Sequence, residues 1–120
     1  MPVPRVIYDR TRQEIDRELT AWVAGIVADM HPDKIILFGS AARREAGEES
    51  DIDLVVIAES SQPFFDRIGR ALALYQGKRD VHVLVYTPAE WERMLAEGRD
   101  FTRTVVAEGQ VLYQRDVTGP

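Results

Sequence analysis

Four residues in one short stretch have the side chains and the spacing to bind a phosphate and a metal ion. Gly39 and Ser40 follow one apolar run, and Asp51 and Asp53 stand ten residues further on, where another apolar run begins. Glycine lets the chain turn sharply close to a ligand, and serine adds a hydroxyl beside the free N–H groups that open a helix, where phosphate binds well. Alternate residues of a strand point the same way, with Cα atoms roughly 7 Å apart, so both carboxylates face one spot. Because Mg²⁺ binds such carboxylates and shares them with substrate phosphates, the stretch has the groups needed for phosphoryl or nucleotidyl transfer.

Arg43 is a second candidate for phosphate binding. It lies one helical turn beyond Ser40 in the helix-prone segment 41–46, close enough to reach a phosphate bound at the turn. A solvated surface charge is the alternative for Arg43. For the two aspartates the alternative is pairing with the backbone or with Arg43. Metal binding is the simpler explanation of the aspartates, because two unpaired carboxylates that point the same way repel each other unless a cation lies between them.

The composition is that of one globular domain comprising residues 1–120. Cysteine is absent, which excludes disulfides, thiolate metal ligands and cysteine nucleophiles. The net charge of −5 disfavours a general nucleic-acid-binding protein, since such proteins carry a basic face, and we expect no direct nucleic-acid binding. No segment approaches the ~20 apolar residues of a membrane span, and the N-terminus has no signal-peptide pattern, so we expect a cytoplasmic protein.

Hydrophobic periodicity predicts an amphipathic helix before the Gly-Ser turn. Residues 1–10 contain two prolines and are predicted to form an extended arm, after which Thr11–Glu14 fits a capping box that opens the helix. Apolar residues then recur at steps of three and four until Pro32, which cannot continue a helix. His31 stands at this stop, and we interpret it as a surface histidine near a helix end rather than a ligand.

The remaining elements alternate between strands and helices. Strands are predicted at 34–38, 51–58 and 78–86, with a short edge strand at 110–114. A helix beginning near Pro63 carries an apolar stripe that we expect in the core: Phe64, Phe65, Ile68, Leu72 and Tyr75. Thr87–Glu90 fits a second capping box, for a helix that Gly98 ends, and a last helix covers 101–108. This order predicts an α+β fold, a small mixed β-sheet with helices packed on it.

Four segments resemble the DNA polymerase beta-like nucleotidyltransferase superfamily, and in particular its stand-alone minimal nucleotidyltransferase (MNT) branch. They are Phe38–Arg43, Ser50–Leu54, Val83–Pro88 and Glu108–Tyr113, so the resemblance extends over most of the chain from about Lys34 onward. The specific part of the signal is Gly-Ser followed after ten residues by Asp-x-Asp, each beside an apolar run. MNT proteins are about this long, and they often serve as the antitoxin of a two-gene module whose toxin is a HEPN-domain ribonuclease.

The resemblance implies a polymerase-beta-like fold and metal-assisted transfer of AMP from ATP. In that mechanism Gly39 and Ser40 hold the β- and γ-phosphates, while Asp51 and Asp53 hold one or two Mg²⁺ ions. The implied acceptor is a tyrosine hydroxyl of the HEPN toxin, which AMP attachment silences. A chain of 120 residues has no room for a separate substrate domain, so a protein partner that closes over a shallow site suits it.

The chain departs from this family on the third predicted strand, where members usually carry a third aspartate. His82 occupies that place, and Asp80 stands two residues earlier, on the same face by strand alternation. Three interpretations remain open. His82 acts as the general base, because the ordinary pKa of histidine is near neutrality; or Asp80 reaches in and restores the carboxylate; or the third acid is lost and catalysis is weak or absent.

Two other functions compete with AMP transfer to a toxin. One is nucleotidyl transfer to a small molecule of the aminoglycoside kind, which we rank lower because those enzymes generally have an additional helical domain. The other is a non-catalytic antitoxin that neutralises its toxin by contact, its transfer site having decayed through the change at His82. The sequence leaves the nucleotide preference and self-association into a homo-oligomer open.

Overall fold

The fold is that of a computed structural model, which describes residues 3–39, 42 and 51–115, with the backbone alone for residues 3–14. Its elements in chain order are α1 (Val3–Met30), β1 (Lys34–Phe38), β2 (Ile52–Ile57), α2 (Phe64–Ala73), β3 (Val81–Tyr86), α3 (Pro88–Glu97), α4 (Asp100–Glu108) and β4 (Gln110–Gln114). The strands form one sheet in the order β3-β2-β1-β4. Strand β1 is antiparallel to β2 and β4, while β2 and β3 are parallel. The predicted α+β fold with a small mixed sheet is confirmed.

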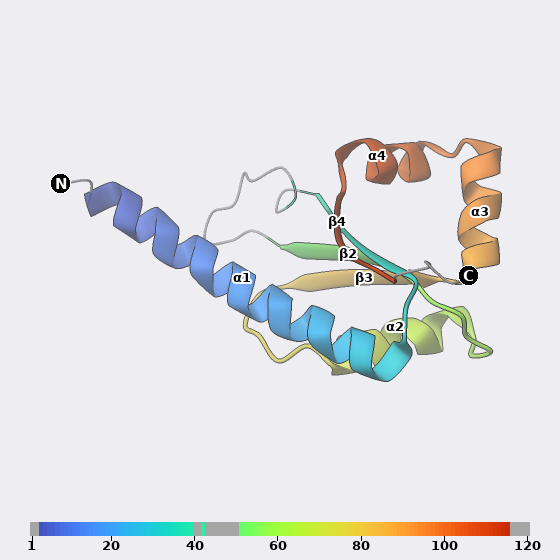
Figure 1. Ribbon diagram of the computed structural model, residues 1–120, viewed down its shortest axis with the longest axis horizontal. Helices are drawn as coiled ribbons and strands as arrows, with labels where there is room; N and C mark the ends of the chain where they lie inside the picture. The colour runs from blue at the N-terminus through green and yellow to red at the C-terminus, as the bar shows by residue number, and fades with distance from the viewer. Residues whose placement is uncertain (1–2, 40–41, 43–50, 116–120) are drawn as a thin grey trace.

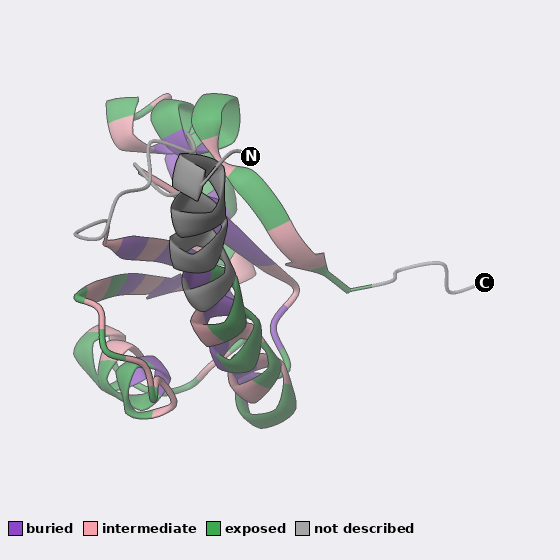
Figure 2. Cartoon of the chain, turned by 90° about the vertical axis from the view of Figure 1, so that its left-hand side faces the viewer, coloured by how far each residue is buried: buried purple, intermediate pink, exposed green. Residues whose placement is uncertain are grey.

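The sheet lies between two layers of helices (Figure 1). On one face, alternate strand residues such as Leu37 and Leu54 pack with Trp22 and Ile26 of α1. The intervening residues face α3 and α4, and the buried members of that second cluster are Ile36, Val55, Ile57, Trp91, Met94 and Val105. Figure 2, which views the sheet from the end where β2 begins, shows buried residues in the strands between helices that are exposed on their outer sides, whereas the edge strand β4 is exposed or half-buried. Burial on both faces explains why β1 and β2 are almost continuously apolar.

The first helix differs from its prediction at the N-terminal end. Helix α1 begins at Val3, so the extended arm predicted for residues 1–10 is wrong, and Thr11–Glu14 lies inside the helix rather than at its start. Pro4 falls in the first turn, where backbone N–H groups have no helical partner in any case, so a proline there removes no hydrogen bond. The end at Pro32 is confirmed. None of the described helices combines the length and the apolar character that crossing a membrane requires.

Helix α2 packs on the core through only part of the predicted stripe, because Ile68 and Tyr75 pack against the core but Phe65 and Leu72 do not. Its buried residues are Arg67 and Ala71, whereas Phe65 is 80% exposed and Leu72 is 39% exposed, so their predicted burial is wrong. The inward rotation of Arg67 is the physical reason. A guanidinium can be buried when its donors find acceptors, and Arg67 finds them on three neighbouring segments.

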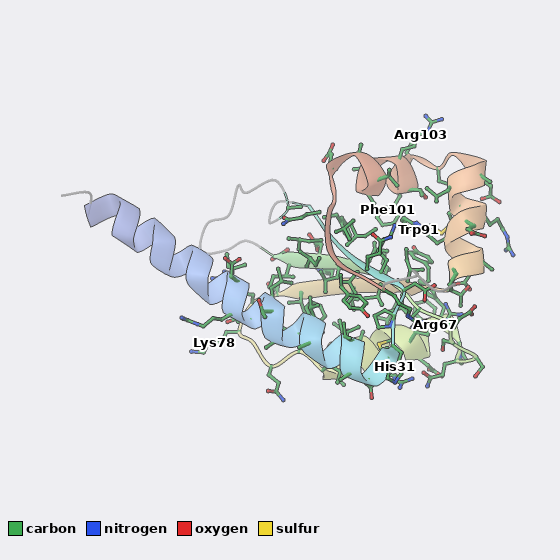
Figure 3. The ribbon with its side chains drawn as sticks, viewed as in Figure 1. His31, Arg67, Lys78, Trp91, Phe101 and Arg103 are labelled. Carbon is green, nitrogen blue, oxygen red and sulfur yellow. The ribbon has the colours of Figure 1, made fainter. Side chains whose placement is uncertain are left out.

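Arg67 joins α2, β3 and α3 at the end of the sheet where β3 ends (Figure 3). Its guanidinium donates to the carbonyl oxygens of Gln62 at 2.9 Å and Val85 at 3.2 Å, and to both carboxylate oxygens of Glu90 at 2.8 and 3.2 Å. The same Glu90 carboxylate accepts from the N–H of Thr87, which completes the predicted capping box of α3. These hydrogen bonds from Arg67 and Thr87 lower the pKa of Glu90 despite its partial burial.

We predict that Arg67→Met destabilises the fold by about 1–3 kcal/mol at pH 7, because several buried acceptors lose their donor. Since the pKa of Glu90 is lowered, its contribution is complete above the ordinary value of 4.5 and is lost as the pH falls through the lowered pKa. The difference between wild type and variant should therefore shrink in acid. Urea unfolding at pH 7 and below pH 4.5 measures both effects.

The matched control is Arg70→Met on the same helix. Arg70 pairs with Asp29 at 2.6 Å, but both side chains are 42% exposed, and an exposed pair contributes little, within about 1 kcal/mol. Equal losses of stability for the two variants, or a loss for Arg67→Met that does not depend on pH, would contradict the account of Arg67.

Candidate active site

Strand register brings three of the predicted site residues to one end of the sheet. Asp53 pairs with Phe38 on β1 and with His82 on β3, so these three side chains form a row across the sheet on the face that carries α3 and α4. Asp51 precedes β2 by one residue. The row lies where β1 ends and where β2 and β3 begin, which is one end of the sheet.

His82 contacts both aspartates. Its Nδ1 lies 2.8 Å from Oδ1 of Asp53 and 4.0 Å from Oδ2 of Asp51. An ionised carboxylate can only accept a hydrogen bond, so Nδ1 is the donor to Asp53, and in the neutral ring Nε2 then carries the free lone pair. The His82 side chain is 65% exposed, so a substrate can approach this ring. The geometry fits a proton acceptor whose orientation Asp53 fixes.

Gly39 closes the other side of Asp53. It has a φ of 77°, in the left-handed region that favours glycine. A Cβ at this position would lie 2.5 Å from Oδ2 of Asp53, which is closer than any real Cβ contact. The backbone of the turn and the carboxylate are therefore in direct contact, with the second carboxylate oxygen directed at His82.

Three predicted site residues remain: Ser40, Arg43 and Asp80. Ser40 and Arg43 lie outside the described residues. Asp80 precedes β3 and is exposed; its backbone carbonyl accepts from the N–H of Ile52 at 3.2 Å. Strand β3 begins at Val81 rather than at residue 78, so Asp80 stands one residue before the strand.

The carboxylates of Asp51 and Asp53 suit a hard cation when a substrate supplies further oxygen ligands. Within the described parts of the chain, no three His, Cys, Asp or Glu side chains form a group that could hold a metal ion. Asp51 and Asp53 are 43% and 20% exposed and surround one ring nitrogen, so their oxygens lie together at the surface. Mg²⁺ is commonly held by one or two carboxylates, with water and phosphate oxygens as the remaining ligands. The two aspartates fit such a site.

The site roles of two apolar residues, Phe38 in this row and Leu84 beside it, were missed in the sequence. Phe38 lies next to Asp53 and makes an edge-to-face contact with Phe101 of α4, with the ring centroids 5.6 Å apart. Leu84 follows His82 on the same face of β3 and is half-buried. Strand alternation already puts Leu84 on the same face as His82. That Phe38 lies beside Asp53 follows only once the register between the strands is known.

Comparison with known proteins gives one family match. The family described as polymerase beta, nucleotidyltransferase, matches residues 25–118, a range that includes the turn and both aspartates. A protein of Methanocaldococcus jannaschii, provisionally named a protein adenylyltransferase, is 35% identical over 82 residues, which cover 67% of this chain and 77% of the relative.

Solved structures show the same fold. The chain is similar to the crystal structure of a provisionally named nucleotidyltransferase from Sulfolobus solfataricus, with a TM-score of 0.65 and 18% identity over 90% of this chain and 87% of the other. A weaker similarity, with a TM-score of 0.49 and 21% identity over 79% and 73% of the two chains, is to a toxin–antitoxin crystal structure with AMP-PNP. The first similarity confirms the predicted polymerase-beta-like fold, and the second is too weak to carry a conclusion.

We predict that Gly39→Ala lowers the free energy of unfolding by about 1–3 kcal/mol, because it combines a strained φ with a clash against Asp53. The same substitution in an Asp53→Ala background should cost less, since the clashing oxygen is gone. Urea denaturation of the four proteins of this double-mutant cycle measures the coupling.

Gly69→Ala is the control for the glycine substitution itself. Gly69 lies in α2 with nothing within 4 Å of its hypothetical Cβ, so alanine should stabilise the protein by up to about 1 kcal/mol. A coupling of zero between Gly39 and Asp53 would show that the two do not touch.

Proposed function

The chain belongs to the polymerase beta nucleotidyltransferase family, and we propose that this nucleotidyltransferase transfers AMP from ATP to a tyrosine hydroxyl of a partner protein. The observation that carries the proposal is the position of Asp53, between the backbone of Gly39 and the ring of His82. Transfer of this kind depends on placement and electrostatics more than on covalent chemistry, so a small sheet with one open end is sufficient scaffold.

Apart from Asp80, the predicted site residues each have a role in the proposed reaction. Asp51 and Asp53 hold Mg²⁺, which when bound neutralises charge on the α-phosphate. Gly39 lets the turn approach the triphosphate, and Ser40 and Arg43 keep their predicted roles at the β- and γ-phosphates. The tyrosine oxygen forms a bond to the α-phosphorus, the bond to the bridging oxygen of the β-phosphate breaks, and pyrophosphate leaves.

His82 is the proposed proton acceptor. Its Nδ1 is engaged by Asp53, so Nε2 is the atom that takes the proton from the tyrosine hydroxyl as the new bond forms. Among the three interpretations of the third strand, this one agrees with the hydrogen bond and the exposure of His82. It also gives Asp53 a second task, the orientation of the base.

The acceptor and the biological role rest on likeness rather than on geometry. The name of the Methanocaldococcus relative supports a protein as the acceptor, and the MNT resemblance supports a HEPN ribonuclease toxin with the chain as its antitoxin. Neither of two hollows on the α1 side, of about 420 and 480 Å³, includes the aspartates or His82 in its lining. The row lies instead at an open end of the sheet, where a protein surface can reach it. The proposal puts both proteins in the cytoplasm, where ATP is available.

Asp51→Asn and Asp53→Asn should each reduce transfer at least about 100-fold, because a neutral amide holds Mg²⁺ poorly. The melting temperature should stay within a few degrees, since both variants remove repulsion between neighbouring carboxylates. The assay combines the purified protein, Mg²⁺, ATP labelled in its α-phosphate and the purified product of the adjacent gene. Asp66→Asn on α2 is the exposed control and should keep the wild-type rate. A carboxylate variant at full activity would refute the metal assignment.

His82→Asn separates proton transfer from positioning. The asparagine amide can still donate to Asp53 from the place of Nδ1, but it has no group at the place of Nε2. We expect transfer to fall by about 10²–10⁴-fold, the usual contribution of a general base. A rate near that of wild type would assign His82 a positioning role only.

His82→Asp tests the third carboxylate in the same assay. If His82 already serves as the base, the aspartate variant should not exceed the wild-type rate. A clear rise in rate would show that wild type lacks a third acid and that its catalysis is weakened.

A further inference from the structure

We infer that the protein acceptor docks along the open face of β3 and the first turn of α2. This surface, called the apolar strip below, consists of Leu84, Tyr86, Phe64 and Phe65. The inference rests on the proposed function, because it concerns where the acceptor of that reaction must lie. Its partner is a folded protein that presents a tyrosine hydroxyl and, at some distance from it, an apolar pocket.

The order of the strands fixes the side from which the acceptor arrives. The Gly39 turn at the end of β1 is proposed to hold the leaving phosphates, Asp53 of β2 stands in the middle, and His82 of β3 is on the other side. The attacking and leaving oxygens of phosphoryl-type transfer are roughly in line. The acceptor oxygen therefore approaches over β3, which is an edge strand of the sheet.

Helices α3 and α4 cover β3 less completely than β2. Val55 on β2 is fully buried, whereas its partner Leu84 on β3 is half-buried. The next pair repeats the pattern, with Ile57 at 5% exposure and Tyr86 half-buried. The helical cover is therefore thinner over β3, where α3 reaches Tyr86 through Trp91, with the ring centroids 5.7 Å apart. A half-buried apolar strip leads along β3 away from His82.

A chain of aromatic rings extends this strip beyond the strand. The ring of Tyr86 lies 5.6 Å from that of Phe64, which lies 5.5 Å from that of Phe65. Figure 1 shows the first turn of α2 beside the end of β3 that is remote from Gly39. From His82 to Tyr86 is roughly 13 Å along the strand, so the strip continues well past the reach of a small-molecule acceptor. Its length suits a protein.

Phe65 is the expected anchor of the interface. It is the most exposed of the large apolar side chains recorded in the described residues, at 80%. An aromatic side chain presented in this way, on a rigid helix and continuous with a site, is the kind of residue that dominates binding energy at protein interfaces.

The experiment compares Phe65→Ser with Val106→Ser, using the purified product of the adjacent gene as the probe. Val106 is 60% exposed on α4, which covers the other strands, so both variants remove an exposed apolar side chain and both should fold. Three quantities are measured: the Kd of the probe without nucleotide, the KM of the probe in AMP transfer, and the affinity for ATP. Sedimentation of the chain alone reports self-association.

For Phe65→Ser we expect Kd and KM for the probe to rise at least about tenfold with ATP affinity unchanged, as for loss of an interface hot spot. Val106→Ser should leave all three unchanged. Equal effects of the two variants, no effect of Phe65→Ser, absence of binding, or a change confined to self-association would overturn the docking assignment. Binding that depends on Phe65 but leads to no transfer would support docking while refuting the proposed function, so the two failures are distinguishable.

Discussion

The carboxylate of Asp53 is held from two sides by neighbouring strands, and the site depends on that constraint. One oxygen lies against Gly39 at the end of β1, and the other accepts from His82 on β3. Both contacts follow from a single register in which Phe38, Asp53 and His82 share a row. A slip of one residue in either pairing would turn Asp53 or His82 to the opposite face. The positions of Asp53 and His82 are therefore fixed by the register of the sheet.

The rest of the fold keeps that register in place while leaving one end of the sheet free. Two apolar clusters, one on each face, fix the strands along most of their length. At the end remote from Gly39, Arg67 ties α2 to β3 and to the first turn of α3. The polar, exposed residues gather at the opposite end, where a nucleotide and a partner can approach. The Arg67 hydrogen bonds and the candidate site thus lie at opposite ends of the same strands.

Patterns among neighbouring residues predicted strands and helix caps well. They failed for burial and for contacts that depend on segments far apart in the sequence. The capping box at Thr87 and Glu90 and the strands around Gly39 were confirmed, because each depends on residues within a few positions. The predicted start of α1 was wrong because the first turn of a helix tolerates proline. Phe65 was placed in the core because periodicity cannot show that Arg67, with partners on three segments, turns the helix. For the site, the two aspartates and the turn could be chosen from the sequence, whereas the contact between Asp53 and His82 requires the parallel register of β2 and β3.

The central claim is that the Gly39 turn and the two aspartates converge on one magnesium-bound triphosphate. Titration calorimetry with α,β-methylene-ATP, which cannot undergo AMP transfer, tests it most directly when run with Mg²⁺ and with EDTA. The account predicts saturable binding that requires Mg²⁺ and disappears when Asp51 and Asp53 are both replaced by asparagine. Equal affinity in EDTA, or undiminished affinity in the double variant, would contradict it.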